Sequence, residues 1–246
     1  MAEREIVFRV TRYRPTAGGR PTFQDYRIPV RDDMVVLDGL NYIKDHVDPS
    51  LTFRWSCRMG ICGSCGANVD GRPRLTCGTY IRDLGKRIVK VEPLSNFPIL
   101  KDLVVDFDDF LNKLASVKPH IIRKDWGDWT KEYTQYPEDL EAYRQQSLCI
   151  NCMLCYAACP VVGASPEFVG PAASALALRY IRDTRDEGAA ERLARLNTKT
   201  GVWECTFVGE CSVVCPKDVD PAGAIQTLKF LATQRHMRRL LMPGAR

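Results

Sequence analysis

The sequence lacks long hydrophobic runs and has only three histidines among its 246 residues. Apolar-rich segments such as 172–178 are far too short to span a bilayer. The N-terminal residues contain neither the apolar segment of a signal peptide nor the composition of a transit peptide. We therefore expect a chain that is soluble or reaches a membrane only through a partner. His46, His120 and His236 are far apart in the sequence, which favours surface or structural roles over catalytic ones.

Strong charge bias is also missing. The net charge of +5 is mild, and no basic run is interleaved with aromatic residues, so we expect no nucleic-acid partner. The length suits two domains, and a hydrophobic content of 45% can supply each with a core.

Eleven cysteines are the unusual feature of the composition. They lie in three tight clusters at metal-ligand spacing, and their number is odd. Both facts favour metal binding in a reducing compartment over disulfides.

One group of cysteines, in the second half of the chain, has the spacing C-x2-C-x2-C-x3-C-P, which bacterial ferredoxins use to bind cubane iron–sulfur clusters. Its ligands are Cys149, Cys152, Cys155 and Cys159. In this pattern the fourth cysteine binds a second cluster, so a partner run is expected.

The partner run has Cys205, Cys211 and Cys215, but Val208 stands where the second ligand belongs. Because valine cannot bind iron, one cluster lacks a protein ligand at one corner. We predict a [4Fe–4S] cluster on Cys149, Cys152, Cys155 and Cys215, and a [3Fe–4S] cluster on Cys159, Cys205 and Cys211.

A third cluster matches the plant-type spacing C-x4-C-x2-C…C of [2Fe–2S] ferredoxins. Its predicted ligands are Cys57, Cys62, Cys65 and Cys77. The interleaved Gly60, Gly63 and Gly66 let the loop fold tightly and turn N–H groups toward sulfur. A four-cysteine zinc site is the alternative, but it favours paired C-x2-C knuckles.

The residues around this third cluster predict a β-grasp domain over 1–105. Strands are expected at 6–13, 23–30 and 88–91, with a helix from 36 to about 48 capped by Asp32 or Asp33. Asp70-Gly71 predicts a hairpin turn.

The remainder, 106–246, is predicted to be an all-α domain, which makes the fold class α+β. Amphipathic helices are expected around 107–114, from Pro137 into the first cubane run, from Pro171 to about Arg182, and at 189–197. Asp220-Pro221 predicts the start of a helix that extends to Leu241.

The three motifs, in this order, closely resemble the iron–sulfur subunit of the succinate dehydrogenase/fumarate reductase family. Connecting segments match as well, including 54–59, 101–106 and 170–173, so the resemblance covers nearly the whole chain. It implies an electron-transfer subunit between the FAD of a flavoprotein subunit and a quinone beside one or more membrane anchor subunits. It also implies that the [2Fe–2S] cluster is nearest the flavin and the [3Fe–4S] cluster nearest the quinone. The expected location is peripheral, on the cytoplasmic face of the bacterial plasma membrane.

The resemblance is closer to the bacterial quinol:fumarate reductases. In many succinate dehydrogenases, a Trp shortly after the first cubane run and a His in the second run contribute to the quinone site. Here residues 161–164 are non-aromatic, and Thr206 stands in the place of the His. Gln226 and Lys229 match the menaquinol-site pair of the fumarate reductases. Without the resemblance, both would be assigned to a solvated helix face.

Two other functions remain open at this point. The nearer one is the iron–sulfur subunit of another flavin-linked respiratory oxidoreductase, with a different electron acceptor. A zinc-stapled scaffold protein belongs to a different class, and the two Cys-Pro terminators argue against it.

Overall fold

The computed structural model describes residues 4–15, 18–125 and 132–241. The chain forms two compact units: Met1–Asp108 with Ile150–Ala158, and Asp109–Cys149 with Cys159–Arg246. We call them the first and second units. The sequence had placed 150–158 in the helical half. The N-terminal prediction rests partly on residues 1–3, which lie outside the described residues.

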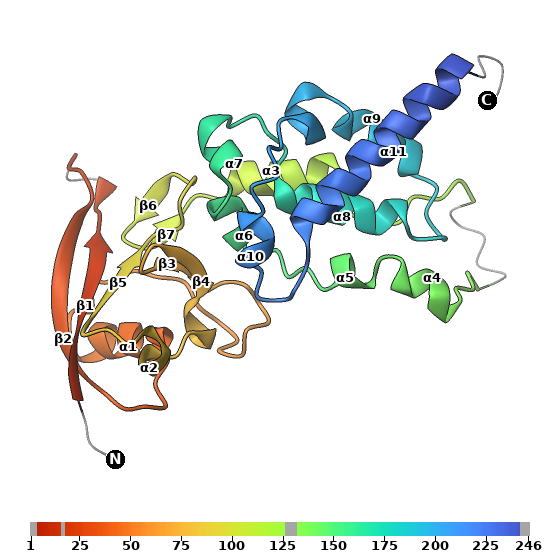
Figure 1. Cartoon of the computed structure of the whole chain (residues 1–246). Coiled ribbons are helices and arrows are strands. Elements are labelled where there is room, and N and C mark those ends of the chain that lie inside the picture. Colours follow the sequence, from red (N-terminus) through yellow and green to blue (C-terminus); the bar gives the residue numbers. More distant parts are fainter. Residues whose placement is uncertain (1–3, 16–17, 126–131, 242–246) are drawn as a thin grey trace. The chain divides into compact units, whose positions relative to one another are not determined.

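A five-stranded mixed sheet organises the first unit, in the order β2-β1-β5-β3-β4 (Figure 1). Its strands are β1 (Arg4–Arg12), β2 (Thr22–Val30), β3 (Gly66–Val69), β4 (Arg72–Leu75) and β5 (Ile88–Glu92). β1 pairs antiparallel with β2 and parallel with β5, while β3 pairs antiparallel with β4 and β5. The predicted fold class is confirmed.

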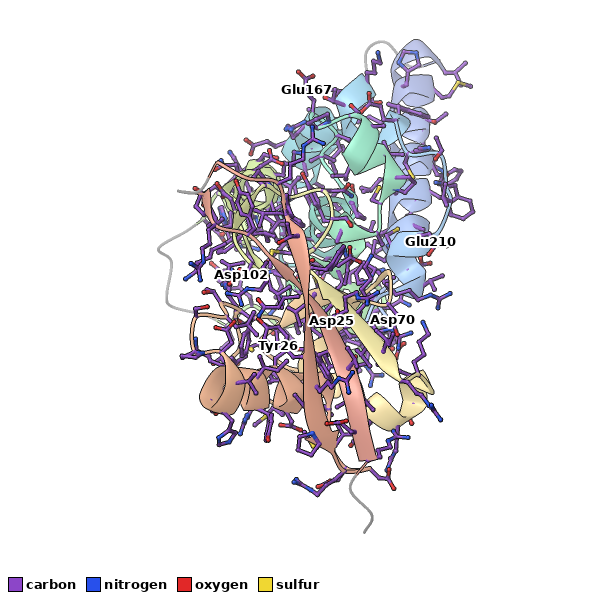
Figure 2. The ribbon with its side chains drawn as sticks, turned by 90° about the vertical axis from the view of Figure 1, so that its left-hand side faces the viewer. Asp25, Tyr26, Asp70, Asp102, Glu167 and Glu210 are labelled. Carbon is purple, nitrogen blue, oxygen red and sulfur yellow. The ribbon has the colours of Figure 1, made fainter. Side chains whose placement is uncertain are left out.

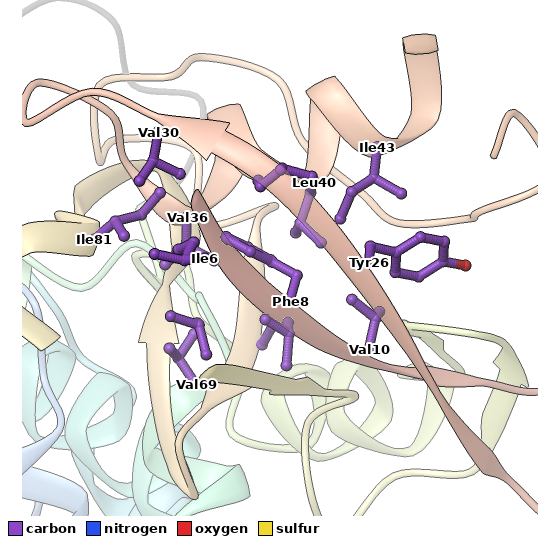
Figure 3. Close-up of a cluster of buried hydrophobic side chains, with 14 of the residues drawn as sticks. Ile6, Phe8, Val10, Tyr26, Val30, Val36, Leu40, Ile43, Val69 and Ile81 are labelled. Atoms are coloured by element: carbon purple, nitrogen blue, oxygen red, sulfur yellow. The ribbon is translucent and has the colours of Figure 1, made fainter. Parts of the chain in front are cut away.

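The helix α1 (Val36–Tyr42), which continues as the π-helix η2 (Ile43–Val47), covers the sheet, and the short helix α2 (Ile81–Leu84) adds the buried Ile81 to the same core. In β1, Ile6, Phe8 and Val10 alternate onto the buried face (Figure 3). The helix approaches Phe8 at Gly39, where an added Cβ would lie 2.4 Å from Phe8 Cζ. A glycine at this position is therefore what allows the helix to seat on the sheet.

The start of α1 differs from the prediction. Its cap involves Asp38, whose carboxylate accepts a 3.0 Å hydrogen bond from the Val35 N–H. Asp32 and Asp33 lie in the preceding turn, and Asp33 instead pairs with Arg31. A carboxylate in the first turn can satisfy an orphan N–H as well as a preceding residue can.

The turn between β3 and β4 is the predicted hairpin. Asp70 and Gly71 both have positive φ, at 51° and 81°, as a type I′ turn requires. This turn returns the chain toward Cys77.

A second hairpin, which the sequence did not predict, follows the sheet: β6 (Ile99–Lys101) and β7 (Val104–Val105). The fully buried Asp102, which is labelled in Figure 2, lies in its turn and accepts hydrogen bonds from Arg12 Nε, the Tyr13 N–H and the Thr52 N–H. One buried carboxylate thus ties this hairpin to the end of β1.

The second unit is helical, and no strand occurs among its described residues, as predicted. Its helices are α3 (Asp108–Ser116), α4 (Pro137–Glu141), α5 (Arg144–Ser147), α7 (Pro160–Ala164), α8 (Pro171–Ile181), α9 (Ala189–Leu196), the π-helix η4 (Lys199–Trp203), α10 (Glu210–Val213) and α11 (Pro221–Leu241). The helix expected from Pro137 is broken into α4 and α5 at Tyr143, which has φ −133°. α11 begins as predicted, because Asp220 Oδ1 accepts from the Gly223 N–H at 2.9 Å.

Segment 150–158 belongs to the first unit through specific contacts. Asn96 donates to the carbonyls of Tyr156 and Ala157, at 3.0 and 3.1 Å. An added Cβ at Gly63 would lie 2.9 Å from Cys152 Cα. These partners are far apart in sequence, so local patterns cannot reveal the contacts.

Candidate metal centres

Cys57 lies in a loop that directs backbone N–H groups at its sulfur. The N–H groups of Met59, Ile61 and Cys62 are 3.4, 3.4 and 3.3 Å from Cys57 Sγ. Gly60 has φ 68°, the left-handed conformation that turns neighbouring N–H groups to one side. These bonds, led by that of Met59, lower the pKa of Cys57 to about 6. The loop is shaped to hold negative charge on sulfur.

Cys65 and Cys77 form a second, more buried pair. Cys65 precedes β3, and its carbonyl accepts from both the N–H and the hydroxyl of Thr76. Cys77 lies in the 3₁₀ helix η3 (Thr76–Gly78). Burial raises the pKa of the Cys77 thiol to about 11, and the adjacent Cys65 thiol adds to the rise.

The Cys57 thiol interacts with that of Cys62, and the Cys77 thiol interacts with that of Cys65 and, more weakly, with the charge of Cys57. A [2Fe–2S] core bound by four cysteines takes two thiolates on each iron, which suits this arrangement. Zinc would instead gather all four around one point. Within the described ranges, no three His, Cys, Asp or Glu side chains form a group that could hold a single metal ion.

The first cubane run folds as a tight turn followed by a short helix. Asn151 and Met153, on either side of Cys152, have φ 52° and 69°. The helix α6 (Leu154–Ala157) follows directly. Left-handed non-glycine residues cost about 1–3 kcal/mol each and concentrate at functional sites. The turn is thus maintained against local strain.

The second run repeats this turn. With the cysteines of the two runs aligned, Phe207 and Gly209 occupy the places of the two left-handed residues, with φ 60° and 87°. The four-residue helix α10 follows, as α6 does in the first run. Val208 lies between them, in the place of Cys152. The second run thus has the backbone of a ligand-presenting turn, with valine in the place of the ligand.

Three cysteines predicted to hold the three-iron cluster meet at one cavity of the second unit. Cys159, Cys205 and Cys211 line it together with Val208, and it is partly open to solvent. Most of the other lining residues are apolar: Pro160, Val161, Phe168, Pro171, Phe207, Ala222 and Ile225.

Burial raises the pKa of Cys159, and raises that of Cys211 to about 11, with the neighbouring cysteine thiols adding to the rise. Three crowded thiols in a largely apolar cavity can all ionise only if a cationic group compensates their charge. The N–H groups of Val161 and Val162 supply donors to Cys159. The donor set fits an iron–sulfur core bound by three thiolates.

The remaining predicted ligands are divided between the units. Cys152 and Cys155 belong to the first unit, and Cys149 and Cys215 to the second. Because these four cysteines come from two separate units, the [4Fe–4S] ligand set stays a prediction.

α11 carries both residues predicted to contact quinone. The Gln226 amide nitrogen is buried and has no hydrogen-bond partner among the described residues. Lys229 Nζ donates to the Cys205 carbonyl at 2.8 Å and lies 5.8 Å from the centre of the Trp203 ring. Sequence patterns missed these contacts of Lys229.

Comparisons with known proteins agree with this arrangement. A family model described as "2Fe-2S iron-sulfur cluster binding domain" matches residues 7–112, and one described as "4Fe-4S dicluster domain" matches 145–219. The fumarate reductase iron-sulfur subunit of Mycobacterium tuberculosis (strain CDC 1551 / Oshkosh) is 54% identical over 239 residues, covering 97% of each chain. The chain belongs to the family of succinate dehydrogenase/fumarate reductase iron–sulfur subunits.

Other members of the family support the same assignment. The fumarate reductase iron-sulfur subunit of Haemophilus influenzae is 48% identical over 95% of each chain. A chain of the Mycobacterium smegmatis Sdh1 complex in the apo form superposes with a TM-score of 0.83 at 30% identity, covering 95% of this chain and 98% of that one. None of the helices in the described part of this iron–sulfur subunit is both long and apolar enough to cross a membrane.

Proposed function

We propose that this iron–sulfur subunit passes single electrons between the FAD of a flavoprotein subunit and a membrane quinone, with menaquinone as the quinone. The supporting observation is the cavity where three cysteines meet Val208. We assign a [3Fe–4S] cluster to Cys159, Cys205 and Cys211. The [2Fe–2S] and [4Fe–4S] clusters take the ligands predicted from the sequence.

When bound, the clusters accept and release one electron at a time, which links the two-electron chemistries of flavin and quinone. The protein residues set the environment of each cluster. The N–H groups around Cys57 stabilise negative charge on its sulfur, while burial of Cys159 and Cys211 limits the access of water.

We assign the flavoprotein contact to the exposed side of the Cys57 loop. Trp55, Met59 and Ile61 are exposed there, and the Arg58 guanidinium lies 4.9 Å from the Trp55 ring. Exposed apolar residues that gather with an Arg are typical of an interface. Electron transfer also requires the partner to approach this cluster closely.

We assign the quinone contact to α11 and the nearby loop. The buried Gln226 amide can donate to a quinone carbonyl, which would satisfy a donor that has no partner among the described residues. Phe207, Val213 and Phe230 are exposed in the same unit. We assign them to contact with the membrane anchor, which would hold the subunit at the cytoplasmic face of the plasma membrane.

The test follows electrons through the purified complex. A reduced menaquinone analogue should reduce the clusters, as seen by electron paramagnetic resonance (EPR), and fumarate should then reoxidise them. Gln226→Leu should slow the first step, whereas Gln234→Leu, at an exposed position of the same helix, should not. Clusters that respond to neither quinol nor fumarate would refute the proposal.

A further inference from the structure

Lys229 connects the longest helix of the second unit to the loop that carries Cys205. Its Nζ donates to the Cys205 carbonyl at 2.8 Å, in a partly buried hydrogen bond between residues 24 positions apart. The Trp203 ring, whose centre is 5.8 Å from the ammonium, is itself fixed by a 2.7 Å hydrogen bond from Nε1 to Asn197 Oδ1. A positive charge is thus held at the backbone of a predicted cluster ligand.

The surroundings make that charge important. Apart from the cysteines, the described lining of the three-cysteine cavity has one charged side chain, that of Glu210. Glu210, which is labelled in Figure 2, is exposed. In such a mostly apolar cavity, electrostatic interactions are screened less than in water. Reduction adds one negative charge to a cluster, and a nearby cation stabilises the reduced form more than the oxidised form.

We infer that Lys229 is a positioning residue for the [3Fe–4S] cluster, and that its ammonium on the Cys205 carbonyl raises the reduction potential of that cluster. This inference rests on the proposed function. It adds a role toward the cluster to the quinone contact predicted for Lys229. The contrasting possibility is that Lys229 serves only as a mechanical link between α11 and the loop.

Three substitutions separate charge from hydrogen bonding. Lys229→Met removes both, Lys229→Gln removes the charge but keeps a donor, and Lys229→Arg keeps both. Arg235→Gln is the matched control, because Arg235 is also on α11 and donates to a backbone carbonyl, that of Ala190, at 2.9 Å. It lies about 9 Å further along the helix axis.

The measurement is a redox titration of the [3Fe–4S] EPR signal in the intact complex. We expect lower midpoint potentials in Lys229→Met and Lys229→Gln, and unchanged potentials in Lys229→Arg and Arg235→Gln. The midpoint of the [2Fe–2S] signal should stay constant in every variant. If Lys229→Met fails to retain the cluster, Lys229→Gln decides.

An unchanged midpoint in Lys229→Gln, or an equal shift in Arg235→Gln, would overturn the inference while leaving the proposed function intact. A wild-type complex with no [3Fe–4S] signal would overturn the cluster assignment on which the inference rests.

Discussion

Two glycines of the [2Fe–2S] loop give a matched test of how tightly the first unit packs. Gly60 and Gly63 have nearly the same conformation, φ +68° and +71°. A Cβ at Gly60 would meet nothing within 4 Å, whereas one at Gly63 would lie 2.9 Å from Cys152 Cα and 3.1 Å from the Ile150 carbonyl oxygen. Gly60→Ala should therefore cost only the left-handed penalty of about 1–2 kcal/mol. Gly63→Ala should cost about 1–3 kcal/mol more, for overpacking.

The extra destabilisation corresponds to roughly a 5- to 150-fold change in the equilibrium between the closed and opened loop. The assay is the fraction of complex that retains its [2Fe–2S] EPR signal after graded heating. Gly63→Ala should lose the signal at a clearly lower temperature than Gly60→Ala. Equal behaviour of the two variants would refute the packing of segment 150–158 against this loop.

Three further predictions concern the second run, a buried ion pair and acid stability. Val208→Cys should complete the ligand set and abolish the oxidised [3Fe–4S] signal, and it should raise the iron content from about nine to about ten atoms. Val213→Cys, at an exposed site on α10, should change neither the signal nor the iron content. Asp186→Asn should destabilise the second unit by about 3–5 kcal/mol in thermal unfolding, because it leaves the buried Arg192 cation unpaired; a shift of less than 1 °C would contradict this. Hydrogen bonds, led by that of the Ser50 hydroxyl, hold the pKa of Asp48 well below its usual range. The stability that Asp48 supplies is thus complete above pH of about 4 and is lost as the pH falls. Asp48→Asn should therefore flatten the acid side of the curve of stability against pH. An unchanged acid slope in this variant would contradict the role of Asp48.

Much of the candidate site could be predicted because its information is local in the sequence. Cysteine spacing predicted the four ligands of the [2Fe–2S] loop, and valine at position 208 singled out the three cysteines that line one cavity of the second unit. Asp220-Pro221 located the start of α11, and Asp70-Gly71 located a type I′ turn. Each of these signals depends on a few neighbouring residues whose stereochemistry allows little else.

The features that escaped prediction depend on contacts between distant residues. Segment 150–158 joins the first unit because Gly63 lets Cys152 approach and Asn96 binds the Tyr156 carbonyl. The contact between Lys229 and the Cys205 carbonyl likewise requires a fold that brings α11 to the loop. The prediction of one helix from Pro137 into the first cubane run is wrong, because hydrophobic periodicity does not reveal the break at Tyr143.

The central claim is that the chain carries a three-iron cluster because Val208 stands where the ferredoxin spacing has a cysteine. It is tested most directly by low-temperature EPR of the complex as isolated in its oxidised state. The account predicts a [3Fe–4S] signal that integrates to about one spin per subunit and disappears on reduction, as the reduced [2Fe–2S] and [4Fe–4S] signals appear. An oxidised complex that is fully loaded with iron but shows no such signal would contradict it.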